Sequence, residues 1–326
     1  MDITDRIYGT IEITNPLIIA LINSKPLQRL QHISQDGATH FIHPTLNGNR
    51  FEHSVGVWHL SQLYNRLLEE QVACLLHDVP HTAFSHVVDY VMNEHNTQEY
   101  HDQFLQQIVL NSDIPAICER HGLDITKVLH KEDYALLDNK LPDLSFDRWD
   151  YYMRDAHISG ILPLETIQLI VKSVKLKDNQ LYFVDAQVAG LLSAISIMNS
   201  QLVYNSASSY GAYFLLASAL KIALEQNILS ETDLFSTDDA VWTKLTTAHN
   251  KEIKALIARL QPGRDFTHVP KSEAEFYGTN KARYLDPLVM HDGTLKRTSE
   301  LVAGLQDCIK THKERHQHVG VKQYDA

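Results

Sequence analysis

Apolar residues recur at three- and four-residue spacing along most of this chain. The pattern runs through NPLIIALINS, SVGVWHLSQLYNRLL, QVACLLHD, HVVDYVMNE and QFLQQIVL, and it places apolar side chains on one face of an α-helix. The clearest strand signal is VKLKDNQLYFV (174–184), in which Asp178 and Asn179 separate two short runs and predict a hairpin turn. We therefore expect an all-α fold with a minor β-hairpin.

Three further segments indicate how the chain is divided. Residues 186–226 have helical spacing again and are rich in small residues. The polar stretch 261–284 contains Pro and Gly and predicts a long loop, and the tail after His312 has no apolar stripe, so we expect it to fray. The prediction is a core of residues 1–185 and a C-terminal helical region of residues 186–326 packed on that core.

Composition narrows the class of protein. Hydrophobic residues make up 44% of the chain, yet no uninterrupted apolar run approaches the roughly 18 residues of a membrane span. The first residues lack the basic and apolar regions of a secretory signal, so we expect a cytoplasmic protein. A net charge of −11 argues against nucleic acid as a partner and leaves a small anionic substrate, held by a metal ion and a few arginines.

Histidine is concentrated where a metal site would need it. His77 and Asp78 end an apolar helical run, His53 lies upstream in RFEHSVGV, and Asp147 lies downstream in SFDRWDYYMRDA. Two imidazoles and two carboxylates form a mixed nitrogen and oxygen set that suits Mn, Fe, Ni, Zn or Mg. A divalent ion held in this way lowers the pKa of a bound water, which can then attack phosphorus.

These motifs resemble those of the HD-domain phosphohydrolases. The opening DRIYGTIEITNPLIIALINSKPLQRLQHISQDG, followed in order by RFEHSVGV, LLHDVPHTAFSH and FDRWDYYMRDA, is similar to the deoxynucleotide triphosphohydrolase branch, which includes the sterile-alpha-motif-and-HD protein. The resemblance implies an HD-domain helical core with a C-terminal helical region. It also implies metal ligands at the positions His53, His77, Asp78 and Asp147.

The same resemblance assigns catalytic roles around the metal. His81 and His86 would act as acid or orienting groups near the phosphate. His101 and Asp102 match the family's later pair of a histidine and an acid, although His95, preceded by Glu94, competes for that role.

Substrate contacts are implied at further positions. Arg50 and Arg148 match phosphate-binding positions, Tyr151 and Asp155 match sugar or phosphate contacts, and Gln35 and Asp36 match the sugar edge, where Asp36 replaces an apolar residue. Tyr210 matches a tyrosine on a later helix of that branch, which implies a further substrate contact.

One phosphate-binding cation of that branch is missing from this chain. Ala212 and Tyr213 stand where the branch has His and Lys. The site would then favour fewer phosphates or another leaving group, or it would take a cation from Lys281, Arg283 or a neighbouring subunit.

Structural interpretations compete with each assignment. The four ligands could be unrelated capping and surface residues. His81 and His86 could bond to the backbone of turns, and His101 could be an exposed residue at a helix start. Arg50 could pair with a surface acid, and Tyr151 could belong to the core.

The leading hypothesis is a metal-dependent phosphohydrolase that acts on nucleotides, with deoxynucleoside triphosphate as the first substrate to test. The alternatives are a nucleoside monophosphate phosphatase or a cyclic-nucleotide phosphodiesterase on the same site, and a non-catalytic nucleotide-binding regulator. A homo-oligomer is implied by resemblance, and a membrane partner is not expected.

Overall fold

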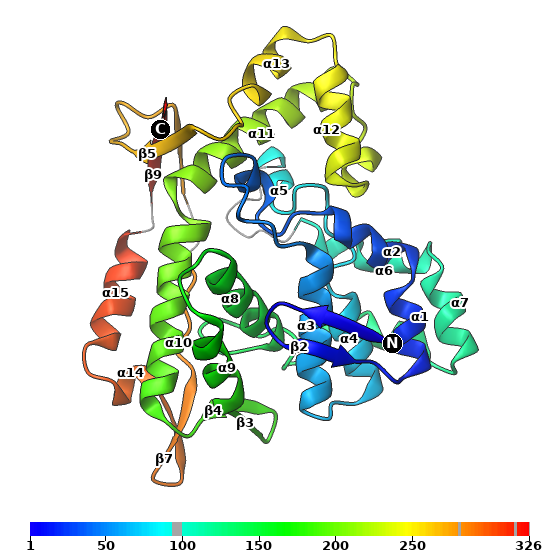
Figure 1. The fold of residues 1–326 in the computed structure, drawn as a ribbon, viewed down its shortest axis with the longest axis vertical. Coiled ribbons are helices and arrows are strands. Elements are labelled where there is room, and N and C mark those ends of the chain that lie inside the picture. Colours follow the sequence, from blue (N-terminus) through cyan, green and yellow to red (C-terminus); the bar gives the residue numbers. More distant parts are fainter. Residues whose placement is uncertain (93–99, 280–281, 316–317, 326) are drawn as a thin grey trace.

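Helices build most of the molecule. The computed structural model describes residues 1–92, 100–279, 282–315 and 318–325 (Figure 1). The α-helices are α1 (Pro16–Ile22), α2 (Lys25–Arg29), α3 (Arg50–Leu63), α4 (Leu68–Leu76), α5 (Val87–Val91), α6 (Leu105–Leu110), α7 (Ile114–Arg120), α8 (Phe146–Ile158), α9 (Leu164–Ser173), α10 (Ala186–Asn199), α11 (Ala207–Glu225), α12 (Asp238–Thr247), α13 (Lys251–Ile257), α14 (Thr298–Leu301) and α15 (Leu305–Arg315).

Short turns of tighter or wider helix connect these elements. The 3₁₀ turns are η1 (Leu30–His32), η2 (Gly37–Phe41), η3 (Asp102–Phe104), η4 (Ile125–Val128), η5 (Lys131–Asp133) and η7 (Glu231–Phe235), and η6 (Ser200–Tyr204) is a π-helical turn between α10 and α11.

Helices α3, α4 and α8 pack together at the centre of the N-terminal half. Helix α3 begins after Asn49, whose side chain accepts a hydrogen bond from the backbone N–H of Glu52, and α8 begins after Ser145, which caps the N–H of Arg148. Apolar side chains of all three helices, among them Val57, Leu75 and Trp149, belong to one buried cluster. This buried cluster therefore supports both capped helix starts. Helices α3 and α8 each carry polar residues of the cavity described below.

A second buried cluster joins the C-terminal half to the segment around α5. It includes Phe84 and Val88 before and within α5, Leu216 of α11, and Val321 near the C-terminus. The helices expected within residues 186–226 are confirmed as α10 and α11. Figure 1 shows α11 running from the end of α10 towards α12 and α13, with the C-terminus beside β5 and far from the N-terminus.

The prediction of an all-α fold is wrong, because the protein contains three small β-sheets. The strands are β1 (Asp2–Asp5), β2 (Gly9–Glu12), β3 (Val174–Lys177), β4 (Gln180–Phe183), β5 (Arg264–His268), β6 (Phe276–Gly278), β7 (Leu288–His291), β8 (Thr294–Arg297) and β9 (Val319–Asp325). They form sheets in the orders β1-β2, β3-β4-β7-β8 and β5-β9-β6. The hairpin at 174–184 is confirmed, with Asp178 and Asn179 at positive φ, but it is part of the four-stranded sheet.

The segments expected to be irregular hold three of the seven missed strands. The predicted loop 261–284 contains β5 and β6, and the tail expected to fray contains β9, which pairs with both. Most strands are only three to five residues long, so period-two alternation has little room to show. A boundary between residues 185 and 186 stays a prediction.

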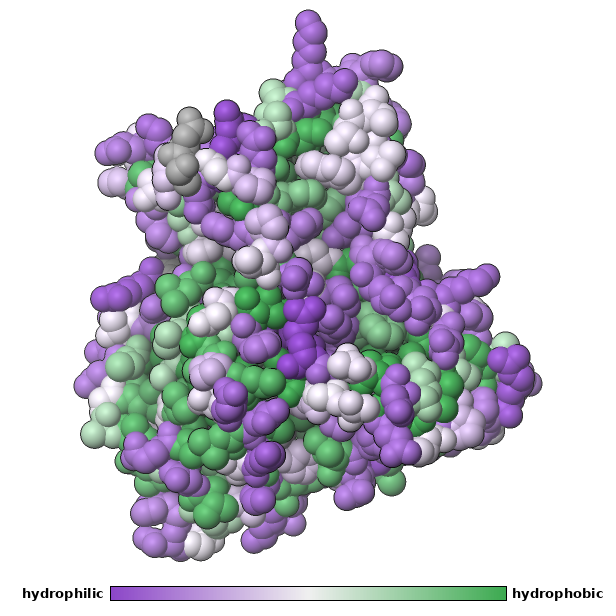
Figure 2. Space-filling view, viewed as in Figure 1, coloured by the Kyte–Doolittle hydropathy of each residue, from purple (hydrophilic) through white to green (hydrophobic). Residues whose placement is uncertain are grey.

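Two stretches are apolar and long enough to cross a membrane by length and composition alone, Ala186–Tyr204 and Ala207–Glu225. About half or more of each tested window, 50% and 61%, is buried inside the protein, as in core helices. Figure 2 shows apolar residues at the surface over α9 and α10, and the exposed apolar side chains of these helices include Leu169, Leu191 and Met198.

Candidate metal centre and its cavity

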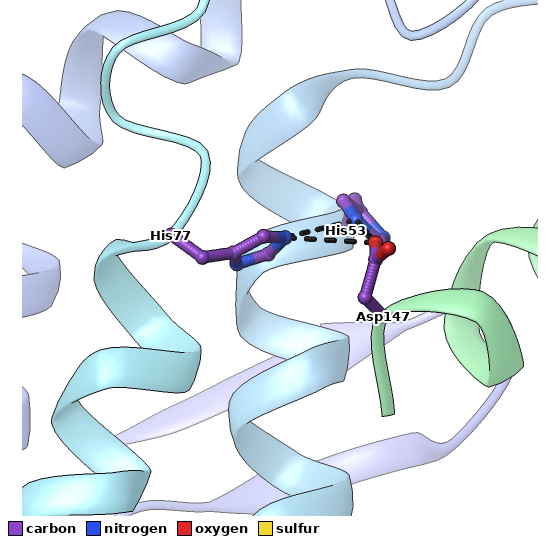
Figure 3. Close-up of side chains that lie close together, drawn as sticks. All are labelled: His53, His77 and Asp147. Carbon is purple, nitrogen blue, oxygen red and sulfur yellow. Dashed lines mark hydrogen bonds and ion pairs between the residues drawn. The ribbon is translucent and has the colours of Figure 1, made fainter. Parts of the chain in front are cut away.

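Three predicted ligands converge from three separate helical segments. Nε2 of His53, in α3, lies 3.0 Å from Oδ1 of Asp147, in α8, and 3.3 Å from Nε2 of His77, at the end of α4. The His77 Nε2 atom lies 3.7 Å from the same Asp147 oxygen. Figure 3 shows the two rings and the carboxylate pointing towards one another. Two helix starts and one helix end thus bring the three donors to one point.

Asp78, the fourth predicted ligand, lies beside these donors as the residue after His77. One of its carboxylate oxygens lies 3.4 Å from Nε2 of His77, and the other lies 3.7 Å from Nε2 of His53. Arg50 donates from Nη1 to Asp78 at 2.9 Å. This predicted phosphate contact therefore braces a ligand carboxylate, and it lines the cavity beside it.

The turn between α4 and α5 is held in a constrained conformation. Phe84 and Ser85 have φ values of 59° and 52°, in a backbone region that residues other than glycine seldom adopt. The Ser85 hydroxyl accepts from Nε of Arg50 and donates to the carbonyl of Ser34, while Asp238 accepts from the N–H of Phe84 at 2.6 Å. These bonds anchor the segment that carries His81 and His86.

A buried charge network supports His53 from behind. The Nδ1 atom of His53 lies 2.8 Å from Oδ2 of Asp150. Arg154 donates to both oxygens of Asp150, at 2.9 and 2.8 Å, and also pairs with Asp5 of β1 at 3.0 Å. Because Asp150 accepts the Nδ1 proton, Nε2 of His53 keeps its lone pair for a metal ion. Gly56 allows this approach, since a Cβ there would lie 1.9 Å from Asp150.

The shifted pKa values of the centre indicate that it would bind a cation. Burial alone would lower the pKa of His53, but its bonds to Asp147 and Asp150 raise that pKa to about 10. The pKa of Asp78 is held below its ordinary range by His77 and Arg50 despite burial, and His53 and His77 likewise lower the pKa of Asp147. The imidazoles thus hold protons that are stabilised by the neighbouring carboxylates, and a divalent cation can replace these protons.

The donor set fits a single divalent ion. Ligands about 2.1 Å from one ion lie about 3.0 Å apart across an octahedral edge and about 3.4 Å apart across a tetrahedral one. The donor separations of 3.0 and 3.3 Å fall within that range, and the separation of 3.7 Å between His77 Nε2 and Asp147 Oδ1 is slightly longer. Two imidazoles and two carboxylates suit Mn, Fe, Ni, Zn or Mg.

A cluster of buried histidines lies next to this centre. The rings of His81 and His101 stack with centroids 3.6 Å apart, and His86 meets both edge-on. Asp89 accepts from Nδ1 of His86 at 2.8 Å. Burial lowers the pKa of all three imidazoles, that of His101 to about 4. Asp102 lies 3.5 Å from His101, and the competing candidate His95 lies outside the described residues.

The metal centre and the histidine cluster open into one cavity of about 1080 Å³. Nearly all other predicted site residues line it: Gln35, Asp36, Arg50, Asp102, Arg148, Tyr151 and Asp155. Tyr210, predicted as a substrate contact, is not among the described residues that line the cavity. Its side chain is 1% exposed, packs against Phe214 and donates its hydroxyl to the carbonyl of Thr279, while Tyr213 lines the cavity instead.

The basic residues of the cavity are largely engaged by protein groups. Arg148 pairs with Asp138 at 3.0 Å and donates to Asn139 at 2.6 Å. Arg283 lies over the ring of Tyr204, 5.4 Å from its centroid, and also lines the cavity. One of the replacement cations considered from the sequence is therefore present, and Lys281 lies outside the described residues.

Sequence reasoning missed three supporting residues. Asp150 binds His53, Asp89 binds His86, and Tyr204 of η6 donates to Asp155 at 2.8 Å. A spacing of three residues joins Asp147 to Asp150 and His86 to Asp89, so each pair lies on neighbouring helical positions. That spacing is a usable signal for the two carboxylates, whereas nothing local marks Tyr204.

Comparisons with known proteins agree with this geometry. Residues 50–152 match the family model described as HD domain. The metal-dependent phosphohydrolase cns2 of Cordyceps militaris is 32% identical over 299 residues, which cover 89% of this chain and 85% of that protein. Deoxynucleoside triphosphate triphosphohydrolase SAMHD1 of Homo sapiens is 28% identical over 209 residues, 49% of this chain and 33% of that protein.

A solved structure extends the likeness to the whole fold. A phosphohydrolase from Bacteroides thetaiotaomicron matches over 100% of both chains with a TM-score of 0.76. At 19% sequence identity, this match shows a shared fold.

Proposed function

Because this chain belongs to the HD-domain family of metal-dependent phosphohydrolases and is a hydrolase that uses a divalent metal ion, we propose that it hydrolyses a phosphate ester of a nucleotide. The observation that carries the proposal is the convergence of His53, His77 and Asp147 in the wall of a large cavity lined by many charged side chains. Asp78 would be the fourth ligand. A divalent ion bound there lowers the pKa of water and withdraws charge from a phosphoryl oxygen.

Protein groups around the ion would orient the phosphate and move the proton. Arg50 braces Asp78 at 2.9 Å and faces the cavity, so its guanidinium can also contact a phosphate oxygen. His86 and His101 are neutral at neutral pH because burial lowers their pKa. A bound phosphate raises the pKa of a nearby imidazole, and a ring protonated in this way can pass its proton to the leaving oxygen.

The charge balance of the cavity favours a substrate with few phosphates. Seven carboxyl groups and four Lys or Arg side chains are among its described lining residues. Arg50 and Arg148 are already paired with Asp78 and Asp138. One metal ion and the remaining cations can neutralise a monophosphate more completely than a triphosphate. The nucleoside monophosphate is therefore our first candidate substrate.

A deoxynucleoside triphosphate is the second candidate. It is favoured by the similarity to SAMHD1, whose name states that activity, although this chain spans about a third of the length of that protein. The buried Ala212 and the cavity residue Tyr213 stand where the resembled branch has cationic contacts, which weakens this candidate.

The test combines metal analysis with a substrate panel. Purified protein is analysed for bound metal and then assayed, with Mn, Fe, Ni, Co or Mg, against nucleoside monophosphates, deoxynucleoside triphosphates and cyclic nucleotides. Release of orthophosphate identifies a monophosphatase, release of triphosphate identifies the second candidate, and ring opening identifies a phosphodiesterase. The variant Asp78→Asn should lose both metal and turnover, whereas Asp307→Asn, at an exposed position of α15, should retain them.

The opposing result is equally clear. If metal-loaded protein binds nucleotides, as measured by a rise in melting temperature, but forms no product with any metal of the panel, the chain is a nucleotide-binding regulator. If it neither retains a divalent metal nor hydrolyses any phosphorylated compound, the proposed function fails.

A further inference from the structure

The segment that runs from η7 into α12 is hydrogen-bonded to the turn between α4 and α5. The carbonyl of Leu234, in η7, accepts from the backbone N–H of Ala83 at 2.7 Å. Oδ1 of Asp238, the first residue of α12, accepts from the N–H of Phe84 at 2.6 Å, and these two residues are 154 positions apart in the chain. One segment of the C-terminal half therefore holds two successive backbone N–H groups of the turn.

Asp238 uses both of its carboxylate oxygens. Its second oxygen, Oδ2, accepts from the N–H of Ser34 at 2.8 Å, and the carbonyl of Ser34 accepts from the hydroxyl of Ser85. Asp238 thus ties the segment before η2 to the turn at Phe84 and Ser85, the two residues with positive φ. A backbone conformation of this kind persists only where its surroundings hold it, and Asp238 supplies much of that hold.

Helix α12 also contacts the side chain of Phe84. Trp242 lies one turn after Asp238 on α12, and its ring meets that of Phe84 edge-on, with centroids 6.4 Å apart. Trp242 stacks in addition on Phe41, with centroids 4.2 Å apart. Because α12 holds Phe84 through both its N–H and its ring, the conformation of the turn depends on the first two turns of α12.

Arg29 of α2 joins the beginning of the turn to the same segment. Its Nη1 atom donates to the carbonyl of Ser236 at 3.0 Å. Its Nη2 atom donates to the carbonyls of Val79 and His81 at 2.6 and 2.9 Å. These bonds end on backbone groups, so the imidazoles of His81 and His86 are left to line the cavity.

We infer that Asp238 is a positioning residue for catalysis, which holds the turn so that His86 can protonate the leaving group. The inference rests on the proposed hydrolysis of phosphate esters and adds to it a residue that is not among the described residues lining the cavity. Asp238 acts through the N–H groups of Phe84 and Ser34. A displacement of about 1 Å at a reacting group can lower a rate about 100-fold, so loss of Asp238 should lower kcat while the metal ligands stay in place.

An acid at the position of His86 matters most when the leaving group is poor. As water forms its bond to phosphorus, the bond from phosphorus to the ester oxygen breaks, and that oxygen keeps the electron pair and takes the imidazolium proton. Phenolate is a poor leaving group that needs this proton, whereas 2,4-dinitrophenolate is stabilised by its nitro groups and leaves without it. A misplaced His86 should therefore slow the release of phenol selectively. A general loss of stability or of metal would slow both reactions alike.

The experiment compares phenyl phosphate with 2,4-dinitrophenyl phosphate in metal-loaded protein. Values of kcat and KM are measured for wild type, Asp238→Ala, Asp238→Asn and Asp239→Asn, a matched control because Asp239 is exposed in the same turn of α12. We expect Asp238→Ala to lower kcat about 10- to 100-fold for phenyl phosphate and less than about threefold for the dinitrophenyl ester, with KM and bound metal within about twofold of wild type. Asp238→Asn, which has one acceptor oxygen for two N–H groups, should show the same selective loss. The control should match wild type.

The outcomes separate this inference from the proposed function. Equal losses with both esters, or no loss in either Asp238 variant, overturn the inference and leave phosphate ester hydrolysis standing. Nucleotide hydrolysis is judged separately by the substrate panel. Should neither Asp238 variant fold, Trp242→Phe, which shortens the ring packed on Phe84, is expected to show the same selective loss, and equal losses or none would again overturn the inference.

A second measurement decides if the wild type hydrolyses neither aryl phosphate. The NMR signals of the His81 and His86 rings are recorded in protein loaded with diamagnetic Zn and assigned with the variants His81→Gln and His86→Gln. Both signals should shift in Asp238→Asn and stay in place in Asp239→Asn. Unshifted signals in the Asp238 variant would show that the turn does not depend on this carboxylate.

Discussion

Replacing Asp150 with Asn would test how His53 is prepared for metal binding. In the wild type, Asp150 is fully buried, lies 2.8 Å from Nδ1 of His53 and accepts two bonds from Arg154. Asparagine keeps the shape but carries an amide nitrogen in place of one oxygen. That nitrogen must face either the N–H of His53 or the guanidinium, so one existing bond becomes a contact between two donors.

The size of the effect follows from both contacts. Loss of a carboxylate that orients a metal-binding histidine typically weakens metal affinity 10- to 100-fold, which is about 1.4 to 2.8 kcal/mol. The same change leaves Arg154 with Asp5 at 3.0 Å and Glu52 at 4.0 Å as its carboxylate partners. Breaking a buried ion pair from one side costs about 3 to 5 kcal/mol of folding stability. We therefore expect weaker metal binding and, separately, a lower free energy of unfolding.

The two effects are measured independently. The metal dissociation constant is determined by competition with a chromophoric chelator at a temperature where circular dichroism shows the variant to be folded, and stability is determined by urea unfolding of the metal-free protein. Asp307→Asn serves as the control because its side chain is exposed. A folded Asp150→Asn protein that binds the metal within twofold of wild type would refute the assigned role.

Four further predictions follow from individual contacts. Gly56→Ala should lower the free energy of unfolding by about 1 to 3 kcal/mol in urea titrations, because its Cβ would lie 1.9 Å from Asp150. Asp138→Asn should lower the KM for nucleoside triphosphates several-fold in steady-state kinetics by freeing Arg148, and an unchanged KM would contradict this. Wild-type stability should fall by up to about 1.4 kcal/mol per pH unit between pH 4 and 8 relative to Asp36→Asn, because native Asp36, with its pKa raised to about 8, keeps a proton that the unfolded chain has lost. Chelation of the metal should lower the melting temperature, and restoring the ion should reverse the loss.

The order of motifs was sufficient to predict that His53, His77 and Asp147 lie close together. His53, His77, Asp78 and Asp147 lie in helical segments whose apolar faces are strongly periodic, so the packing of those faces carries the ligands along. No local pattern distinguishes Asp150 or Tyr204 from ordinary polar residues. Their roles depend on which helix face turns inward, and that is decided by tertiary packing.

The sequence prediction missed two local hairpins, β1–β2 and β7–β8, and several pairings between segments distant in the chain. Strand β4 pairs in parallel with β7, which lies far downstream, and β9 completes a sheet with β5 and β6. Pairings between remote segments leave little trace in a short window of sequence. The sequence also did not show that α11 turns Tyr210 into the core and presents Tyr213 to the cavity.

The pairing of Arg154 with Asp5 has a consequence for when the metal centre can form during synthesis of the chain. Strand β1 leaves the ribosome well before α8, which supplies Asp147 and Arg154. During that interval the nascent chain holds His53 and His77 without the carboxylate ligand from α8 and without the support of Asp150. Stable loading of the ion must therefore await the emergence of α8, so metal capture would report that the N-terminal half of the enzyme has finished folding.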